Sequence, residues 1–181
     1  MDDSQVKRIS FYLFPFDWEH NNHILEKADT KGHKRKYLVG VASGIQIDGH
    51  GERLTQNAIN SIQRQANSGD ILLYQDVHGI RDNDDIGILD ESDILPNNDW
   101  KTSFRLYDEF DDLDENIVKN NDKLWKKFNG VAPYTRKRQK GFSIEGFVPP
   151  DKILSFEKDA TGRIGKRVID DVILDGVVLV P

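Results

Sequence analysis

The chain contains no cysteine among its 181 residues. This absence excludes disulfide bridges, thiolate catalysis and cysteine-ligated zinc, and it fits a reducing compartment. The sequence also lacks an apolar run of the roughly 20 residues that a membrane span requires. Its most apolar amino-terminal stretch, residues 9–16, is interrupted by Pro15. We therefore expect no membrane partner and no export signal.

The sequence has no excess of positive charge. It carries 25 Lys and Arg against 31 Asp and Glu, for a formal net charge of -6. This balance does not favour nucleic acid as a partner. The length fits one main domain with a sizeable core. A change of composition predicts that residues 1–36 form an aromatic arm and a basic linker, and that residues 37–181 form that domain.

Two segments have helical spacing. The first follows Thr55, a favoured N-cap residue, and ends at Gly69. The second places Leu113, Ile117, Leu124 and Phe128 on one face and ends at Gly130.

Short strand patterns dominate the rest of the chain. Because they do not alternate regularly with helices, they favour an α+β, mainly β fold with a closed or nearly closed barrel. Residues 149–166 are expected to form a loop with a short helix. The strand candidates are residues 37–44, 71–74, 86–89, 100–107, 142–148 and a long final strand, 167–180.

Three ordered segments carry the residue types of a serine hydrolase. Val77-His78-Gly79 supplies a base, Gly141-Phe142-Ser143-Ile144-Glu145-Gly146 a nucleophile, and Asp171-Val172-Ile173-Leu174-Asp175 an acid. A serine hydroxyl needs an imidazole to accept its proton, and an acid on the far ring nitrogen orients that imidazole. On a strand, Phe142 and Ile144 anchor one face in the core. Ser143 and Glu145 then share the other face, which we expect to line a cleft.

Four segments follow one another in the order of a known set of motifs: Val39-Gly40-Val41-Ala42-Ser43 with Asp48-Gly49-His50-Gly51-Glu52-Arg53, His78 followed by Ile86-Gly87, Gly141-Phe142-Ser143-Ile144-Glu145-Gly146, and Leu174-Asp175-Gly176-Val177-Val178-Leu179-Val180-Pro181. They resemble the successive motifs of tailed-phage prohead maturation proteases. The resemblance covers roughly residues 37–181. It implies a fold like assemblin, the herpesvirus assembly protease: a closed or nearly closed antiparallel β-barrel of about seven strands surrounded by a few helices.

The resemblance implies a serine endopeptidase in which Ser143 is the nucleophile and His78 the general base. Every histidine lies at or before His78, so an acid must orient it, unless the site is a dyad. Asp175 is the preferred acid and Asp171 the alternative. Both are expected to face one side of a regular strand, about 13 Å apart. His78 and Ser143 are expected to come within hydrogen-bond reach.

The resemblance also implies a biological setting. The substrates would be capsid and scaffold proteins and the chain itself, cut inside the immature prohead in the host cytoplasm. The enzyme would be latent before assembly, would use no metal or organic cofactor, and would form a homo-oligomer, a dimer or higher.

Two other functions fit the same residues. One is a catalytically inactive capsid scaffold or assembly module with the same barrel. The other is an enzyme that uses His78 with Asp76, Asp84 or Asp85 around a divalent cation. The run of residues 136–140 is basic, and we interpret it as a solvated loop that is also placed for substrate docking or self-cleavage. The remaining histidines are interpreted as surface residues: His20, His23, His33 and His50.

Overall fold

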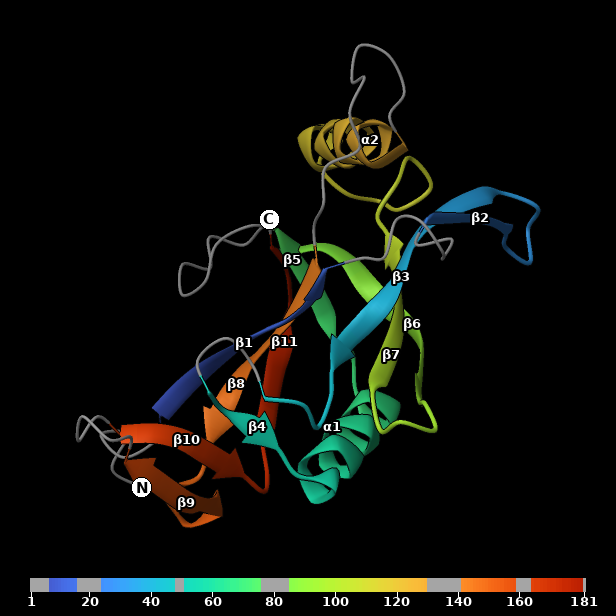
Figure 1. The fold of residues 1–181 in the computed structure, drawn as a ribbon. Coiled ribbons are helices and arrows are strands. Elements are labelled where there is room, and N and C mark those ends of the chain that lie inside the picture. Colours follow the sequence, from blue (N-terminus) through green and yellow to red (C-terminus); the bar gives the residue numbers. More distant parts are fainter. Residues whose placement is uncertain are drawn as a thin grey trace.

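The structure is a computed structural model. It describes residues 7–15, 24–47, 51–75, 85–129, 141–158 and 164–180. These residues form one large curled sheet, one small sheet and two α-helices (Figure 1). The expectation of a mainly β fold with a few helices is confirmed.

The large sheet has eight strands in the order β1-β8-β11-β5-β6-β7-β3-β2. Its curl brings β3 opposite β8, and Phe104 of β7 packs edge-on against Phe142 of β8 across the interior, with ring centroids 5.2 Å apart. The strands are β1 (Lys7–Pro15), β2 (Ile24–Ala28), β3 (Lys34–Ser43), β5 (Leu72–Gln75), β6 (Asp85–Ile94), β7 (Trp100–Leu106), β8 (Gly141–Val148) and β11 (Ile173–Val180).

The expected closed antiparallel barrel is wrong in two respects. Within the part of the chain that the structure describes, β1 and β2 are the edges of an open half-barrel, and no strand pairing joins them. In addition, β11 pairs parallel to β5. The parallel pair arises because the chain does not enter β11 through a hairpin from β5 but arrives from the small sheet. Strands β1 and β2, from the expected amino-terminal arm, belong to the large sheet, and β3 begins inside the expected linker.

The small sheet corrects the prediction for residues 149–180. Its order is β4-β10-β9, with β4 (Arg53–Leu54), β9 (Ile153–Lys158) and β10 (Ile164–Ile169), and a short 3-10 helix (Pro150–Lys152) precedes β9. The expected loop therefore contains strands. The expected single final strand is broken, because β10 and β11 lie in different sheets.

Side-chain hydrogen bonds explain this break. The Asp170 carboxylate accepts hydrogen bonds from the Thr55 hydroxyl and the Asn57 amide, at 2.7 and 3.3 Å. The Asp171 carboxylate accepts one from the N–H of Val172 at 2.9 Å. Aspartate side chains that bond locally in this way offer the chain an alternative to a continuous strand. The chain therefore turns between the two sheets.

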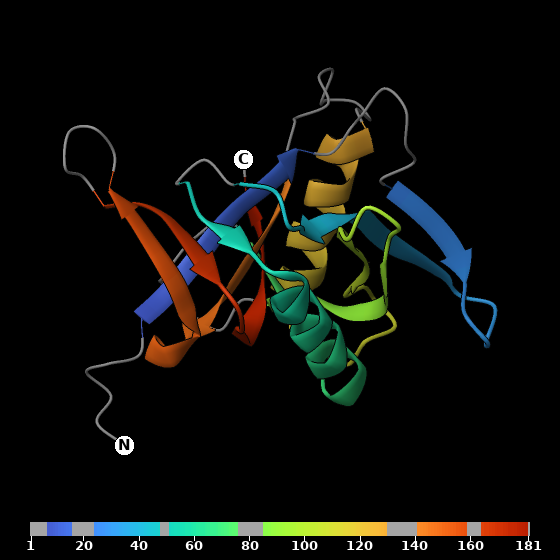
Figure 2. The ribbon, with the colours of Figure 1, turned by 60° about the horizontal axis from the view of Figure 1, so that its bottom comes forward.

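The two helices lie at opposite ends of the half-barrel (Figure 1). Helix α1 (Gln56–Ser68) begins after Thr55, whose hydroxyl accepts a hydrogen bond from the N–H of Ala58, and ends at Gly69, as predicted. Figure 2 brings α1 forward and shows the small sheet and the hairpin of β2 and β3 on opposite sides of it. Helix α2 (Glu115–Asn129) buries Leu124 and Phe128 as predicted, whereas Leu113 precedes the helix and is exposed.

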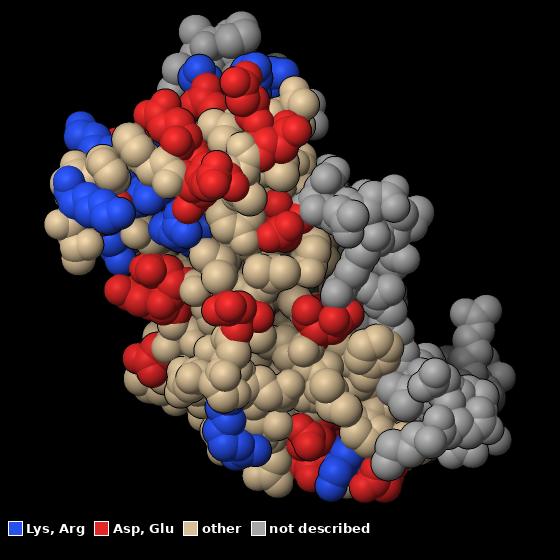
Figure 3. Space-filling view, turned by 180° about the vertical axis from the view of Figure 1, so that it is seen from behind, with Lys and Arg blue, Asp and Glu red and all other residues tan. Residues whose placement is uncertain are grey.

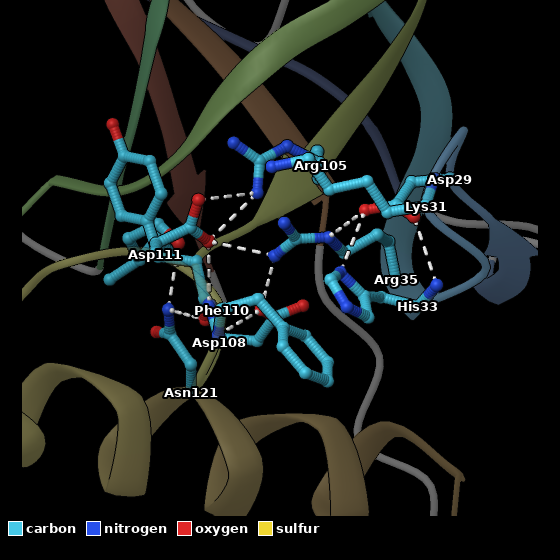
Figure 4. Close-up of polar contacts among 11 residues, drawn as sticks. Asp29, Lys31, His33, Arg35, Arg105, Asp108, Phe110, Asp111 and Asn121 are labelled. Carbon is cyan, nitrogen blue, oxygen red and sulfur yellow. Dashed lines mark hydrogen bonds and ion pairs between the residues drawn. The ribbon is translucent and has the colours of Figure 1, made fainter.

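A cluster around Arg35 joins β3 to the connection that follows β7 (Figure 4). The guanidinium of Arg35 donates hydrogen bonds to Asp29 at 3.1 Å and to Asp111 at 3.3 Å, and it also pairs with Asp108. Arg105 of β7 binds the same Asp111 carboxylate at 2.8 and 2.9 Å. The shared carboxylate fixes the hairpin of β2 and β3 relative to the segment that leads into α2.

The charge of Asp29 is expected to make the fold sensitive to acid. Burial acts to raise the pKa of Asp29, but hydrogen bonds from the His33 N–H, the Arg35 side chain and the Lys31 N–H lower it from 3.8 to about 2. A pKa lowered by folding stabilises the folded state above the unfolded pKa, and this contribution is lost as the pH falls toward 2. Asp29→Asn should therefore lower the free energy of unfolding at pH 7, and this effect should shrink steadily as the pH falls from about 4 to 2.

The measurement is urea unfolding followed by circular dichroism from pH 7 to pH 2. Asp112→Asn, which neutralises an exposed carboxylate outside the cluster, is the control and should follow the wild type. A difference between Asp29→Asn and the wild type that stays constant over the whole range would contradict this linkage.

Candidate functional site

Ser143 lies near the start of β8, between β1 and β11. The prediction that Phe142 and Ile144 face the core is confirmed, since both are 0% exposed within the core cluster. Ser143 and Glu145 lie on the other face, as strand alternation requires. Both side chains are buried, since Ser143 is 0% and Glu145 1% exposed. The expected cleft on this face therefore stays a prediction.

The pairing register brings β5 close to Ser143. Ser143 pairs with Val178 of β11, and Val178 pairs with Tyr74 of β5. Neighbouring strands lie about 4.8 Å apart, so the backbones of Ser143 and Tyr74 are about 10 Å apart. Tyr74 in turn pairs with Asp85 at the start of β6. One row of residues thus crosses four strands from Ser143 to Asp85.

His78 follows Gln75, the last residue of β5, three positions later. It lies outside the described residues, so its separation from Ser143 stays a prediction. Gln75 pairs with Leu179, which pairs with Phe142. The end of β5 is therefore at the same end of the sheet as the beginning of β8. The last described residue before His78 is therefore two strand spacings from the strand that carries Ser143.

The register sets Asp175 apart from the end of β5. Asp175 is the extra residue of a bulge in β11, where Leu174 pairs with Gly146 and Gly176 with Glu145. Because β5 and β11 are parallel, Asp175 lies toward the start of β5, about 13 Å along the strand from the residue opposite Gln75. To orient His78, Asp175 would need that histidine to return along most of β5.

Asp171 lies farther still, in the connection between β10 and β11, where it binds the N–H of Val172. The expectation that Asp171 and Asp175 face one side of a regular strand is wrong. The strand is broken at residues 170–172 and bulged at Asp175. The structure therefore does not bring the two predicted acids together at the end of β5.

Glu145 is a carboxylate that the sequence pattern left without a role. It lies two residues from Ser143 on the same face of β8, so the two Cα atoms are about 7 Å apart. It is also almost fully buried, which is unusual for a glutamate. Strand alternation in the sequence predicts the face of β8 on which Glu145 lies. Its burial distinguishes it from other glutamates, and that burial depends on the whole fold, because both faces of β8 are covered.

The structure explains why Gly146, the second glycine of the Ser143 motif, is a glycine. A Cβ atom on Gly146 would lie 2.4 Å from the carbonyl oxygen of Ile173 and 2.9 Å from a methyl group of Val172. The carbonyl oxygen of Ile173 can move away only if the backbone of β11 shifts. Glycine is therefore the residue that fits where β8 lies against the start of β11. The same close approach holds the strand of Ser143 against β11.

Gly146→Ala is expected to lower the free energy of unfolding by about 2 to 3 kcal/mol, because overpacking forces the backbone of β11 to shift. Gly69→Ala is the matched control, since the nearest atom would be 3.9 Å from the new Cβ, and it should change stability by less than about 0.5 kcal/mol. Both are measured by urea unfolding. Equal effects of the two substitutions would contradict the close approach.

The divalent-cation alternative stays a prediction, because only Asp85 of its candidate ligands lies within the described residues. Among the described residues no group of three or more His, Asp and Glu side chains could hold a metal ion. Asp85 instead accepts a hydrogen bond from the Tyr107 hydroxyl at 2.7 Å, and burial together with this bond raises the pKa of Tyr107. His33 stacks on Phe110, with ring centroids 3.9 Å apart. The other ligands of the cation alternative, His78, Asp76 and Asp84, lie outside the described residues. So do the basic run 136–140 and three of the histidines interpreted as surface residues: His20, His23 and His50.

None of the helices in the described ranges combines the length and apolar character needed to cross a membrane. Comparisons of the chain with protein-family models, curated proteins and solved structures found no match. The functional assignment must therefore be argued from the geometry of the site.

Proposed function

We propose that the chain is a serine endopeptidase that resembles phage prohead maturation proteases and cuts scaffold and capsid proteins and itself during capsid assembly. The observation that carries this proposal is the row from Ser143 through Val178 to Tyr74. This row brings Ser143 of β8 near β5, the strand that precedes His78 in the sequence. The curled, mainly β sheet with two helices is compatible with an assemblin-like fold.

In the proposed mechanism, Ser143 attacks the peptide carbonyl while His78 accepts the proton of its hydroxyl. His78 then donates this proton to the leaving amine, and water repeats the sequence to release the acyl group. Burial of Ser143 supports such a mechanism, because charges that develop in a site shielded from water interact strongly with fixed dipoles. The same burial requires the covering residues to move before a peptide can bind, which fits a latent enzyme.

We assign the orientation of His78 to Glu145 rather than to Asp175 or Asp171. An imidazole that bonds a hydroxyl on one side and a carboxylate on the other spans two hydrogen bonds of about 2.8 Å and its own ring. The spacing of about 7 Å between Ser143 and Glu145 on one strand face matches that span. Asp175 lies at the other end of β5 and Asp171 beyond it.

The complete burial of Ser143 also favours a second candidate. A serine that is 0% exposed on a central strand fits a capsid scaffold or assembly module that keeps the fold without activity. The two candidates differ in one observable, which is whether peptide bonds are cut only when Ser143 is intact.

The first test co-expresses the full-length chain with the capsid and scaffold proteins of the same virus and follows chain masses by mass spectrometry. We expect new amino termini with the wild type and none with Ser143→Ala. Ser103→Ala is the matched control, because Ser103 is also a buried strand serine, and its hydroxyl has no hydrogen-bond partner within the described residues. The Ser103→Ala variant should produce the same new amino termini as the wild type.

Two outcomes would contradict the protease. Cleavage that persists in Ser143→Ala would remove Ser143 as the nucleophile. Uncut masses from the wild type, in shells that still assemble, would favour the assembly module instead.

The second test compares Glu145→Gln with Asp175→Asn in the same cleavage reaction. Loss of the orienting carboxylate should slow cleavage by roughly 10²- to 10⁴-fold in Glu145→Gln, whereas Asp175→Asn should stay within a few fold of the wild type. Loss of the carboxylate should also lower the pKa of His78, so the midpoint of the pH–rate profile should move to lower pH. A large loss in Asp175→Asn with little loss in Glu145→Gln would reverse the assignment.

A further inference from the structure

A pocket of about 410 Å³ lies at the end of β5, between the start of β6 and the amino-terminal half of α2. Gln75 and Asp85, which flank the segment that contains His78, both line it. The helix contributes Asp114, just before its first residue, and Asn121. The pocket thus adjoins the proposed protease site but consists of other residues.

Asn121, one of the lining residues, carries a buried hydrogen-bond acceptor without a partner among the described residues. Its side chain is 2% exposed, and its Nδ2 atom donates to the carbonyl oxygens of Ile86 and Tyr107 at 2.8 and 2.9 Å. Both amide protons are therefore used, which fixes the orientation of the carboxamide. Its Oδ1 atom has no partner in the described part of the chain. In Figure 4 this oxygen points away from the Arg35 cluster.

The lining is rich in acceptors and negative in charge. Asp85 uses Oδ2 to accept the Tyr107 hydroxyl, and no other hydrogen bond or ion pair joins its carboxylate to a described residue. Asp114 accepts a hydrogen bond from the N–H of Asn116 at 2.7 Å and so caps α2. The described lining contains no lysine or arginine. Figure 3 shows acidic side chains gathered over the upper part of the molecule, toward α2.

We infer that this pocket binds a cationic side chain, lysine or arginine, of the peptide that the protease cuts. A buried acceptor costs free energy when it is left unpaired, and an ammonium or guanidinium group supplies donors together with the matching charge. Ile86 and Ile117 offer apolar surface to the methylene stem of such a side chain. The partial positive charge at the start of α2 does not oppose the cation, because Asp114 already offsets it.

The register relates the pocket to the cleavage site, and this step rests on the proposed function. Asp85 ends the row that begins at Ser143 and crosses Val178 and Tyr74. Three strand spacings amount to about 14 Å. An extended peptide covers about 3.3 to 3.6 Å per residue, so the basic residue should lie about four positions from the cut bond.

The test is a titration of the full-length, ¹⁵N-labelled Ser143→Ala chain, followed by NMR. The probe is N-acetyl-lysine amide, and N-acetyl-norleucine amide, which has a similar stem without the charge, is its control. The lysine probe should cause saturable shifts of the Asn121 side-chain amide and the Gln75 and Ile86 backbone amides. The norleucine probe should not.

Asp85→Asn and Asp114→Asn should each weaken lysine binding about tenfold. Both are mild changes, because asparagine still accepts the Tyr107 hydroxyl and remains a good N-cap. Asp151→Asn, which neutralises an exposed carboxylate of the 3-10 helix, should leave binding unchanged. Equal binding of both probes, or binding insensitive to Asp85 and Asp114, would overturn the inference.

The test of the pocket is independent of the test of protease activity, because binding is measured on a chain that lacks its proposed nucleophile. Lysine binding together with an inactive wild type would uphold the pocket and remove the endopeptidase. The opposite result has two parts: the wild type cuts at sites without a basic residue about four positions away, and the chain does not bind the lysine probe. This result would contradict the pocket and support the endopeptidase.

Discussion

The central position of β11 is the constraint on which the rest of the structure depends. This strand, near the end of the sequence, pairs antiparallel with β8 on one side and parallel with β5 on the other. Its residues Val177, Val178 and Leu179 are at most 1% exposed. The strand of Ser143 and the strand that leads to His78 do not pair with each other. They become neighbours only through β11, so the candidate site forms only when these distant segments have come together.

Burial of both faces of β8 follows from the same constraint. One face carries Phe142 and Ile144 into the half-barrel, and the opposite face holds Ser143 and Glu145, shielded from solvent. A hydroxyl and a carboxylate in such a place are chemically distinct from the same groups on a surface. Shielding would strengthen their interactions with the imidazole of the proposed mechanism. It also limits access, which links the proposed chemistry to latency.

Local patterns predicted the features that local physics controls. Thr55 and Gly69 marked the limits of α1, because capping depends on a few neighbouring residues. The alternation of side chains along a strand predicted that Phe142 and Ser143 lie on opposite faces of β8. The break near Asp171 was missed because it depends on side-chain hydrogen bonds, including one from Thr55 to Asp170, more than 100 residues away in sequence. The sequence likewise could not reveal the parallel pairing of β5 with β11, which is a long-range choice of partner.

The strand that carries Ser143 was predictable from the sequence, whereas the arrangement of the candidate site around it was not. The serine and its strand were identified from the motif, whereas the bulge at Asp175 and the burial of Glu145 required the assembled sheet. Asn121 gave no local signal, because an asparagine on a polar helix is typical of an exposed surface. Its buried oxygen, which has no partner among the described residues, results from the packing of α2 against the start of β6 and the end of β7.

The most direct test of the central claim is the separation between the Ser143 hydroxyl oxygen and the nearer imidazole nitrogen of His78 in a crystal structure of the wild-type chain. The pairing of β8, β11 and β5 leads us to expect a distance of about 2.6 to 3.5 Å. A separation greater than about 8 Å, with β5 and β8 paired to β11 as described, would contradict a serine protease built on these two residues.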